Sequence, residues 1–256
     1  MLHVEREGRG APLLLIAGLG GTADFWAPLR PLLRDEFELV LFDHRGTGRS
    51  DRPSGGYSVQ RIAADALAIM DALRIERAHV VGHSTGGAVT QTLALDAADR
   101  VDHIVISASW ARSDYYFRLL FETRLAVLEQ AGAKAYAALG QVLGFPPAWT
   151  TDHEAEVTRA IARAEQELAS PDATAARVRM LFAHDRLADL PRITAPTLVL
   201  GAPDDMIVPI AHSREIAGRI PGAAFHALTG GHFFPRTQTK QFAETVSRFL
   251  GGDRVM

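Results

Sequence analysis

The sequence contains no cysteine among its 256 residues. This absence excludes disulfide bonds, thiolate metal sites and a cysteine nucleophile. The chain also lacks a charge excess of either sign, since 27 lysines and arginines stand against 30 aspartates and glutamates. A balanced charge gives no electrostatic footprint for nucleic acid or an anionic membrane. Small neutral or mildly charged molecules are therefore the expected binding partners.

Long hydrophobic runs are absent as well. Residues 1–6 include no apolar segment of signal-peptide length, and no run elsewhere approaches the ~18 apolar residues of a spanning helix. We therefore expect a soluble, cytoplasmic protein, and the sequence leaves a monomer and a homodimer both open. No linker rich in proline, glycine and serine divides the chain, so we expect one unit with an insertion.

Short apolar runs alternate with helical patterns along most of the chain. The runs that we interpret as strands cover residues 13–17, 37–42, 78–81, 101–106, 196–201 and 224–228. This alternation predicts an α/β fold with a doubly wound, mostly parallel sheet. Ligands of such sheets gather at the carboxyl ends of the strands, where Gly18, Leu19, Asp43 and Ser84 would lie.

The pattern changes between residues 112 and 189. Alanine, leucine, arginine and glutamate recur there at helical spacing, with breaks at Gly132, at 144–147 and at 170–171. We expect about four helices that form a cap over the site, inserted into a core made of residues 1–111 and 190–256. The alternative is a helical pack beside the sheet that makes no contact with a substrate.

The stretch Gly82-His83-Ser84-Thr85-Gly86 matches the nucleophile-elbow pattern G-x-S-x-G. In such an elbow a serine occupies a strained turn between a strand and a helix, and its neighbours are glycines because a side chain would collide with the backbone. The pattern alone is weak, and an ordinary glycine turn would also fit it. The apolar run before it and the helical periodicity after it favour the elbow.

A serine hydroxyl needs a base within hydrogen-bond reach and a third group that orients the base. Asp204 and Asp205 follow the strand predicted at 196–201, and His232 follows the last predicted strand. The order Ser, Asp, His is the one expected for an elbow serine. Both aspartates remain candidates on these grounds.

Five segments together resemble the α/β-hydrolase family, from residue 13 to residue 250. They are 18–21, 43–50, 82–87, 205–209 and 231–232. The resemblance implies that Ser84 is the nucleophile and that His232 is the general base and acid. Relatives usually place the orienting aspartate four residues before a proline, which selects Asp205 over Asp204.

An oxyanion hole requires two backbone N–H donors. We expect these to be the N–H groups of Thr85, after the nucleophile, and Leu19, in the loop after the first long strand. The chain has Ala17-Gly18 where relatives often carry His-Gly. Because the donor is a backbone N–H group, the alanine at position 17 should affect catalysis little.

A serine at the elbow excludes the dehalogenases and epoxide hydrolases of this fold, which require aspartate there. Acyl transfer to water from an ester, lactone, amide, carbamate or vinylogous carbonyl remains. In segments 16–21, 82–84, 109–112, 144–149 and 204–209 the chain resembles aminoacrylate hydrolases and 3-oxoadipate enol-lactonases. Ser84-Thr85-Gly86-Gly87 is also similar to cofactor-free haloperoxidases and perhydrolases. A C–C bond hydrolase and a non-catalytic ligand receptor with an intact triad are further alternatives.

Four residues are candidates for substrate binding: Trp110, Arg112, Tyr116 and Phe233. The aromatic residues near the start of the insertion, which include Phe121, are more typical of cap packing than of pocket lining. Arg112, Arg118 and Arg124 could meet a substrate carboxylate, but their acidic neighbours favour surface ion pairs at least as strongly. The histidines form no metal-ligand pattern, so we expect no metal and no organic cofactor. Asp43 and Arg45 are interpreted as residues that fix a turn.

Overall fold

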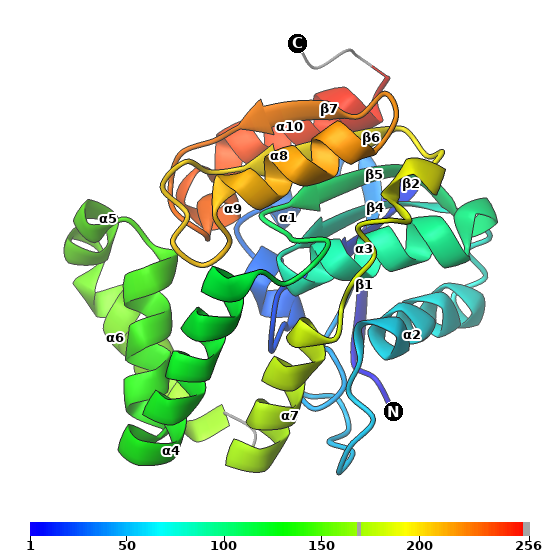
Figure 1. Cartoon of the computed structure of the whole chain (residues 1–256). Helices are drawn as coiled ribbons and strands as arrows, with labels where there is room; N and C mark the ends of the chain where they lie inside the picture. Colours follow the sequence, from blue (N-terminus) through cyan, green and yellow to red (C-terminus); the bar gives the residue numbers. More distant parts are fainter. Residues whose placement is uncertain (168–169, 253–256) are drawn as a thin grey trace.

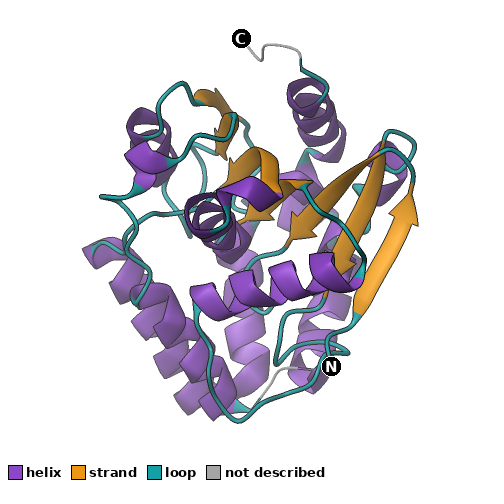
Figure 2. Cartoon of the chain, turned by 90° about the vertical axis from the view of Figure 1, so that its right-hand side faces the viewer, coloured by secondary structure: helices purple, strands orange, loops and turns teal. Residues whose placement is uncertain are grey.

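A computed structural model describes residues 1–167 and 170–252 of the chain. Residues 168–169 of the predicted cap and 253–256 of the predicted core lie outside the described residues. The described chain forms one seven-stranded sheet flanked by helices (Figures 1 and 2). Its strands are β1 (Val4–Gly8), β2 (Ala11–Ile16), β3 (Phe37–Phe42), β4 (Ala78–His83), β5 (Val101–Ser107), β6 (Thr197–Gly201) and β7 (Ala224–Ala227).

The strand order is β1-β3-β2-β4-β5-β6-β7. All neighbours pair in parallel except β1 and β3, which are antiparallel. This arrangement confirms the predicted α/β fold with a doubly wound, mostly parallel sheet. The sequence pattern does not predict β1, because this edge strand is only partly buried and has no continuous apolar run.

Helices cover both faces of the sheet and bury two apolar cores. The helical segments are η1 (Ala23–Trp26), α1 (Arg30–Leu33), α2 (Val59–Ala72), α3 (Thr85–Asp96), η2 (Ala98–Arg100), α4 (Tyr115–Gly144), α5 (Pro147–Asp152), α6 (Glu154–Glu167), α7 (Pro171–Phe182), η3 (Leu190–Arg192), α8 (Ile210–Arg219), α9 (Phe234–Thr237) and α10 (Thr239–Leu250). Ile62, Val89 and Ile216 contribute to one core, whereas Leu33 and Phe242 contribute to the other. Burial of this apolar area is the main term that stabilises the fold.

Helices α4 to α7 follow β5 and precede β6, and they group together to one side of the sheet (Figure 1). Asp114 caps α4 by accepting a hydrogen bond from the N–H of Phe117 at 2.8 Å. Gly132 breaks the regular helix, since its φ of 82° lies in the left-handed region. Across the described ranges, no helix is both long and apolar enough to span a membrane.

Candidate active site

Ser84 occupies the turn between β4 and α3. Its φ of 54° and ψ of −115° are strained for a residue with a side chain. A Cβ added to Gly82 would lie 2.1 Å from the carbonyl oxygen of Gly86, and one added to Gly86 would lie 2.0 Å from that of Ile16. The strand and the helix therefore approach too closely for any side chain at either position. These observations confirm the expected elbow geometry around Ser84.

The backbone of Ser84 is held from two sides. Its N–H donates to the carbonyl oxygen of Ser107 at 2.8 Å, and its own carbonyl accepts from the Ser109 hydroxyl at 2.8 Å. Ser84 is only 6% exposed. A rigid and largely dry setting of this kind strengthens electrostatic interactions with the hydroxyl.

Asp205 and His232 form a direct hydrogen bond. The Nδ1 atom of His232 lies 2.8 Å from Oδ2 of Asp205, and both side chains are almost fully buried. The other carboxylate oxygen, Oδ1, accepts hydrogen bonds from the N–H groups of Ile207 and Val208, each at 2.8 Å. The carboxylate is thus fixed by its own loop, and it can hold the imidazole in one orientation and one tautomer.

Asp204, the alternative candidate, makes different contacts. Its carboxylate accepts hydrogen bonds from the N–H of Gly230 at 3.0 Å and from that of Gly231 at 2.9 Å. These bonds fix the loop that carries His232 without touching the imidazole. The two adjacent aspartates therefore anchor the same loop, one through its backbone and the other through the histidine ring.

Ser84 and His232 line one pocket of about 550 Å³. Within the described part of the chain, no hydrogen bond joins the Ser84 hydroxyl to the His232 ring. Catalytic hydrogen bonds in ligand-free structures are often long and tighten only when substrate binds. The shared pocket places the hydroxyl and the imidazole where a substrate could bring them together.

The two expected N–H donors belong to segments next to Ser84. Thr85 is the first residue of α3, so its N–H belongs to the first turn, whose amides have no partner within the helix. Leu19 lines the pocket, and a Cβ on the adjacent Gly18 would lie 3.2 Å from Cβ of Ser84. The loop after β2 therefore passes close to the serine, as an oxyanion hole requires.

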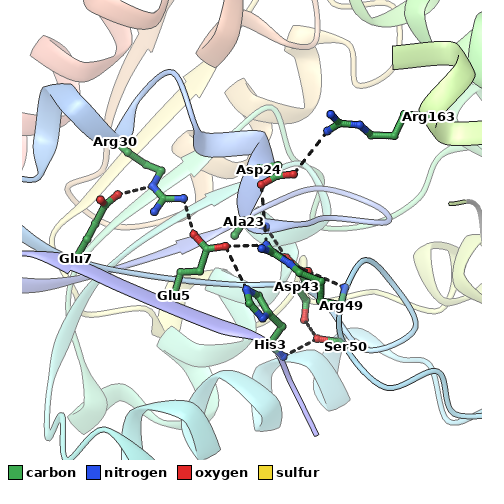
Figure 3. A network of polar contacts seen from close by, with 10 residues as sticks. All are labelled: His3, Glu5, Glu7, Ala23, Asp24, Arg30, Asp43, Arg49, Ser50 and Arg163. Atoms are coloured by element: carbon green, nitrogen blue, oxygen red, sulfur yellow. Dashed lines mark hydrogen bonds and ion pairs between the residues drawn. The ribbon is translucent and has the colours of Figure 1, made fainter. Parts of the chain in front are cut away.

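Asp43 anchors this loop, as Figure 3 shows. Its carboxylate accepts hydrogen bonds from the N–H of Ala23 at 2.9 Å and from the N–H and Nε of Arg49 at 2.9 Å and 3.1 Å. Burial alone would raise the pKa of the Asp43 carboxyl, but these hydrogen bonds outweigh it and the pKa lies below its ordinary value. The interpretation of Asp43 as a residue that fixes a turn is confirmed.

Arg45 has a comparable structural role. Its guanidinium pairs with both carboxylate oxygens of Asp65 on α2. Bidentate pairs of this type fix two segments in a defined orientation. The pair ties the loop after β3 to the neighbouring helix.

His83 packs beside the site. Its Nδ1 atom lies 3.1 Å from the Ser107 hydroxyl, its ring stacks on Phe25 at 5.0 Å, and the His232 ring is 4.8 Å away. Burial, and then the proximity of His232, holds the pKa of His83 well below its ordinary value. His83 therefore stays neutral and packs against the His232 ring, which agrees with the expected packing role.

Of the four residues expected to bind substrate, Phe233 lines the pocket, next to His232. The other three lie elsewhere, so the structure does not support them as pocket residues. Trp110 is buried beneath Phe117, with ring centroids 4.6 Å apart; Arg112 is exposed; and Tyr116 turns its hydroxyl to the carbonyl of Met206 at 2.6 Å. They are near the start of the insertion, whereas the pocket is lined by later parts of it.

Helical residues beyond the four substrate-binding candidates also line the pocket, and two of them, Phe121 and Arg124, belong to the aromatic and arginine groups noted near the start of the insertion. Those contributed by helices α4, α6, α7 and α9 are Phe121, Arg124, Tyr136, Gly140, Glu156, Arg159, Ala160, Arg163, Ala164, Thr174, Arg177 and Arg236. Several sit at helical spacing on inner faces, but a helical pattern does not show which inner residue meets a cavity. Arginine is the most frequent charged residue in this set.

A separate group of side chains lies at the start of β4 and β5, at the opposite ends of these strands from the elbow. Ligand atoms of His79, Asp102 and His103 fall within 4.8 Å of one another, a spacing that could hold a metal ion. Asp102 already lies 3.2 Å from Nδ1 of His103 and 3.5 Å from the guanidinium of Arg77. The aspartate is thus engaged by a cation that would compete with a metal.

A family model described as the alpha/beta hydrolase fold matches residues 11–235. The chain belongs to the α/β-hydrolase family. It is 39% identical over 243 residues to the provisionally named carbamate hydrolase RutD of Caulobacter sp. (strain K31), covering 94% of this chain and 91% of that protein. This membership confirms the family expected from the sequence and shows that the chain is a hydrolase.

Solved structures agree with this assignment. A hydrolase from Pseudomonas aeruginosa PA01 is 31% identical with a TM-score of 0.88, and covers 98% of this chain and 94% of its own. The enol-lactonase from Burkholderia xenovorans LB400 is 27% identical with a TM-score of 0.90, with coverage of 98% and 96%. The whole described α/β hydrolase, including its helical insertion, therefore has counterparts of similar architecture.

Proposed function

We propose that the protein is a serine hydrolase in which Ser84 is the nucleophile, His232 the general base and acid, and Asp205 the orienting carboxylate. Its substrate is a small ester, lactone, amide or carbamate. One observation carries this proposal: the hydrogen-bonded Asp205–His232 pair meets the same pocket as a serine held at a strained elbow. Burial of all three groups supports the assignment.

The first half of the reaction acylates the serine. The Ser84 oxygen attacks the carbonyl carbon while its proton passes to Nε2 of His232. Asp205 accepts a hydrogen bond from Nδ1–H, so it holds the tautomer whose Nε2 lone pair is free and stabilises the imidazolium that forms. The leaving group then takes the proton from His232 as the carbonyl reforms.

The second half hydrolyses the acyl-enzyme. His232 accepts a proton from the water that attacks the carbonyl carbon, and it then gives this proton to the Ser84 oxygen as the C–O bond to Ser84 breaks and the acid product leaves. In both halves the N–H groups of Leu19 and Thr85 donate to the oxygen that becomes negative, a contribution typically worth ~3 kcal/mol per donor. None of these steps requires a metal or an organic cofactor.

The substrate is small in this proposal. The pocket of about 550 Å³ suits a compact molecule, and the relatives bear the names carbamate hydrolase and enol-lactonase. Residues 112–189 serve as the cap, because helices α4, α6 and α7 contribute to the wall of the pocket. An aminoacrylate, a carbamate or an enol-lactone would meet these requirements.

Labelling with a fluorophosphonate and turnover of p-nitrophenyl acetate test the proposal. We expect covalent modification of Ser84 and release of p-nitrophenol, both abolished in Ser84→Ala. The His232→Gln variant should retain the fold and lose turnover by on the order of 10⁴-fold or more. Neither labelling nor turnover in the unaltered protein would instead indicate a non-catalytic ligand-binding member of the family.

A further inference from the structure

Arg177 lies on α7 and lines the pocket that holds Ser84 and His232. The residue is 5% exposed. Its Nη1 donates to the carbonyl oxygen of Gly46 at 3.2 Å, whereas its Nε has no hydrogen-bond partner among the residues that the structure describes. A guanidinium carries five N–H donors, so most of its hydrogen-bonding capacity is not used by this one carbonyl.

The charge of Arg177 is not neutralised by a carboxylate of the described residues. Burial lowers its pKa from the ordinary value, and the other groups that influence it are Tyr57, Tyr136 and Arg52. An arginine nevertheless remains protonated in proteins. A buried cation without a counter-ion is costly, and a bound anion would remove that cost.

A second cation shares this wall. The guanidinium carbon of Arg124 on α4 lies 4.8 Å from the ring centre of Tyr136 and 5.2 Å from that of Phe121. Its Nε is buried and has no hydrogen-bond partner among the described residues. Tyr136 thus contacts Arg124 and also acts electrostatically on Arg177. The two arginines line the same pocket from different helices.

The acidic residues of the wall are paired with other cations. Glu156 forms an ion pair with Arg236 at 2.7 Å, and Asp24 lies 3.7 Å from Arg163, as Figure 3 also shows for the latter pair. Among the described residues, these are the two carboxylates that line the wall. Arg124 and Arg177 are therefore left facing the cavity without a carboxylate from that lining.

We propose that Arg177, assisted by Arg124, binds a carboxylate carried by the substrate. The preferred substrates are then small carbonyl compounds with a free carboxylate at a second position. Guanidinium groups match a carboxylate through two parallel N–H···O bonds, which sets orientation as well as affinity. This inference rests on the proposed function for the identity of the reacting group, but the binding step does not depend on it.

Binding can be tested apart from catalysis. Monomethyl succinate and dimethyl succinate differ by one negative charge, and calorimetric titration into the Ser84→Ala protein measures both without turnover. We expect the monoanion to bind at least ~10-fold more tightly. Equal affinities, or no detectable binding of the monoanion at about 10 mM, would overturn the proposal.

Variants locate the subsite. In the Ser84→Ala background, Arg177→Gln should remove most of the preference for the monoanion, Arg177→Lys should restore part of it, and Arg124→Gln should reduce it. Arg179→Gln is the matched control, because Arg179 lies on the same helix, is exposed and does not line the pocket. A preference that persists in both Arg177→Gln and Arg124→Gln would contradict the assignment. If Arg177→Gln does not fold, the ligand pair and Arg124→Gln decide.

Kinetics then separate this inference from the proposed function. In the unaltered protein, mono-p-nitrophenyl succinate should exceed p-nitrophenyl butyrate in kcat/KM. Arg177→Gln should raise KM for the anionic ester by roughly 10- to 100-fold, with a much smaller change for butyrate. Turnover of both esters without preference would refute the carboxylate subsite alone. Charge-selective binding without turnover or Ser84 labelling would refute the serine-hydrolase mechanism alone.

Discussion

Asp204 accepts a hydrogen bond from the N–H of Gly231 at 2.9 Å, immediately before His232 in the chain. Asp205, the next residue after Asp204, binds the His232 ring itself at 2.8 Å. One carboxylate fixes the loop and the other fixes the imidazole ring. Substitutions at these two neighbours should therefore have different consequences.

The Asp205→Asn variant should lose kcat by on the order of 10³- to 10⁴-fold with little change in KM, because asparagine does not hold the required tautomer. Asp204→Asn should lose much less activity but about 1–3 kcal/mol of the free energy of unfolding, since two backbone N–H groups lose an ionised acceptor. Steady-state kinetics and urea unfolding of both variants measure these effects. An inactive Asp204 variant beside an active Asp205 variant would reverse the roles.

Gly144→Ala should disturb the site from the end of α4. A Cβ at this position would lie 2.2 Å from Cε2 of Phe233, which lines the pocket next to His232. We expect a loss of roughly 1–3 kcal/mol in stability and on the order of 10-fold in kcat/KM. Gly218→Ala on α8 is the control, because nothing lies within 4 Å of its Cβ, and it should leave activity unchanged.

Asp43→Ala should destabilise the protein by about 3 kcal/mol and reduce kcat, because it leaves Arg49 and the N–H of Ala23 without their acceptor. The comparison is Asp24→Asn, whose side chain is 58% exposed and lies 3.9 Å from Arg49. That variant should change stability by less than ~1 kcal/mol. Thermal unfolding and activity of the two variants test the contrast, and equal losses would argue against a specific role of Asp43.

The free energy of unfolding should decrease as the pH is lowered, because two buried histidines become protonated. Burial, together with Arg177 near His44 and Arg186 near His184, lowers the pKa of each ring to about 4. In the unfolded chain these two rings become protonated near pH 6.5, whereas in the folded chain they become protonated only near pH 4. The free energy of unfolding therefore falls as the pH is lowered across that interval. Each ring should contribute roughly 3 kcal/mol to the fall.

Urea unfolding between pH 7.5 and pH 4.5 measures this dependence. His184→Phe keeps a ring of similar shape next to Trp110 and removes the titrating group. Its stability should vary less steeply with pH than that of the unaltered protein. Parallel curves for the two proteins would show that His184 does not contribute to the acid sensitivity.

The sequence predicts the sheet well where strands are buried on both faces, because residues such as Leu13–Ile16 then form unbroken apolar runs. It indicates the short helical segments η1 and α1, between residues 22 and 33, less clearly, since the apolar Leu32 is 40% exposed there. Local periodicity does not determine where such short turns begin and end.

In the candidate site too, local features can be predicted from the sequence, whereas features that depend on tertiary contacts cannot. The elbow at Ser84 is local, so its glycines and flanking patterns identify it in the sequence. The choice between Asp204 and Asp205 depends on which side chain reaches His232 across 27 residues, and only the folded loops show it. Arg177 reaches the pocket wall through tertiary packing alone, since an arginine on an amphipathic helix is usually exposed.

The carboxyl end of α4 is attached to the loop that carries the base. The N–H of Phe233 donates to the carbonyl of Gly144 at 3.0 Å, and a Cβ on Gly231 would lie 2.7 Å from that same oxygen. Any opening of the insertion that displaced Gly144 would pull His232 away from Ser84. The ion pair between Glu156 on α6 and Arg236 on α9 adds a second link, so the insertion is coupled to the position of His232 at two points.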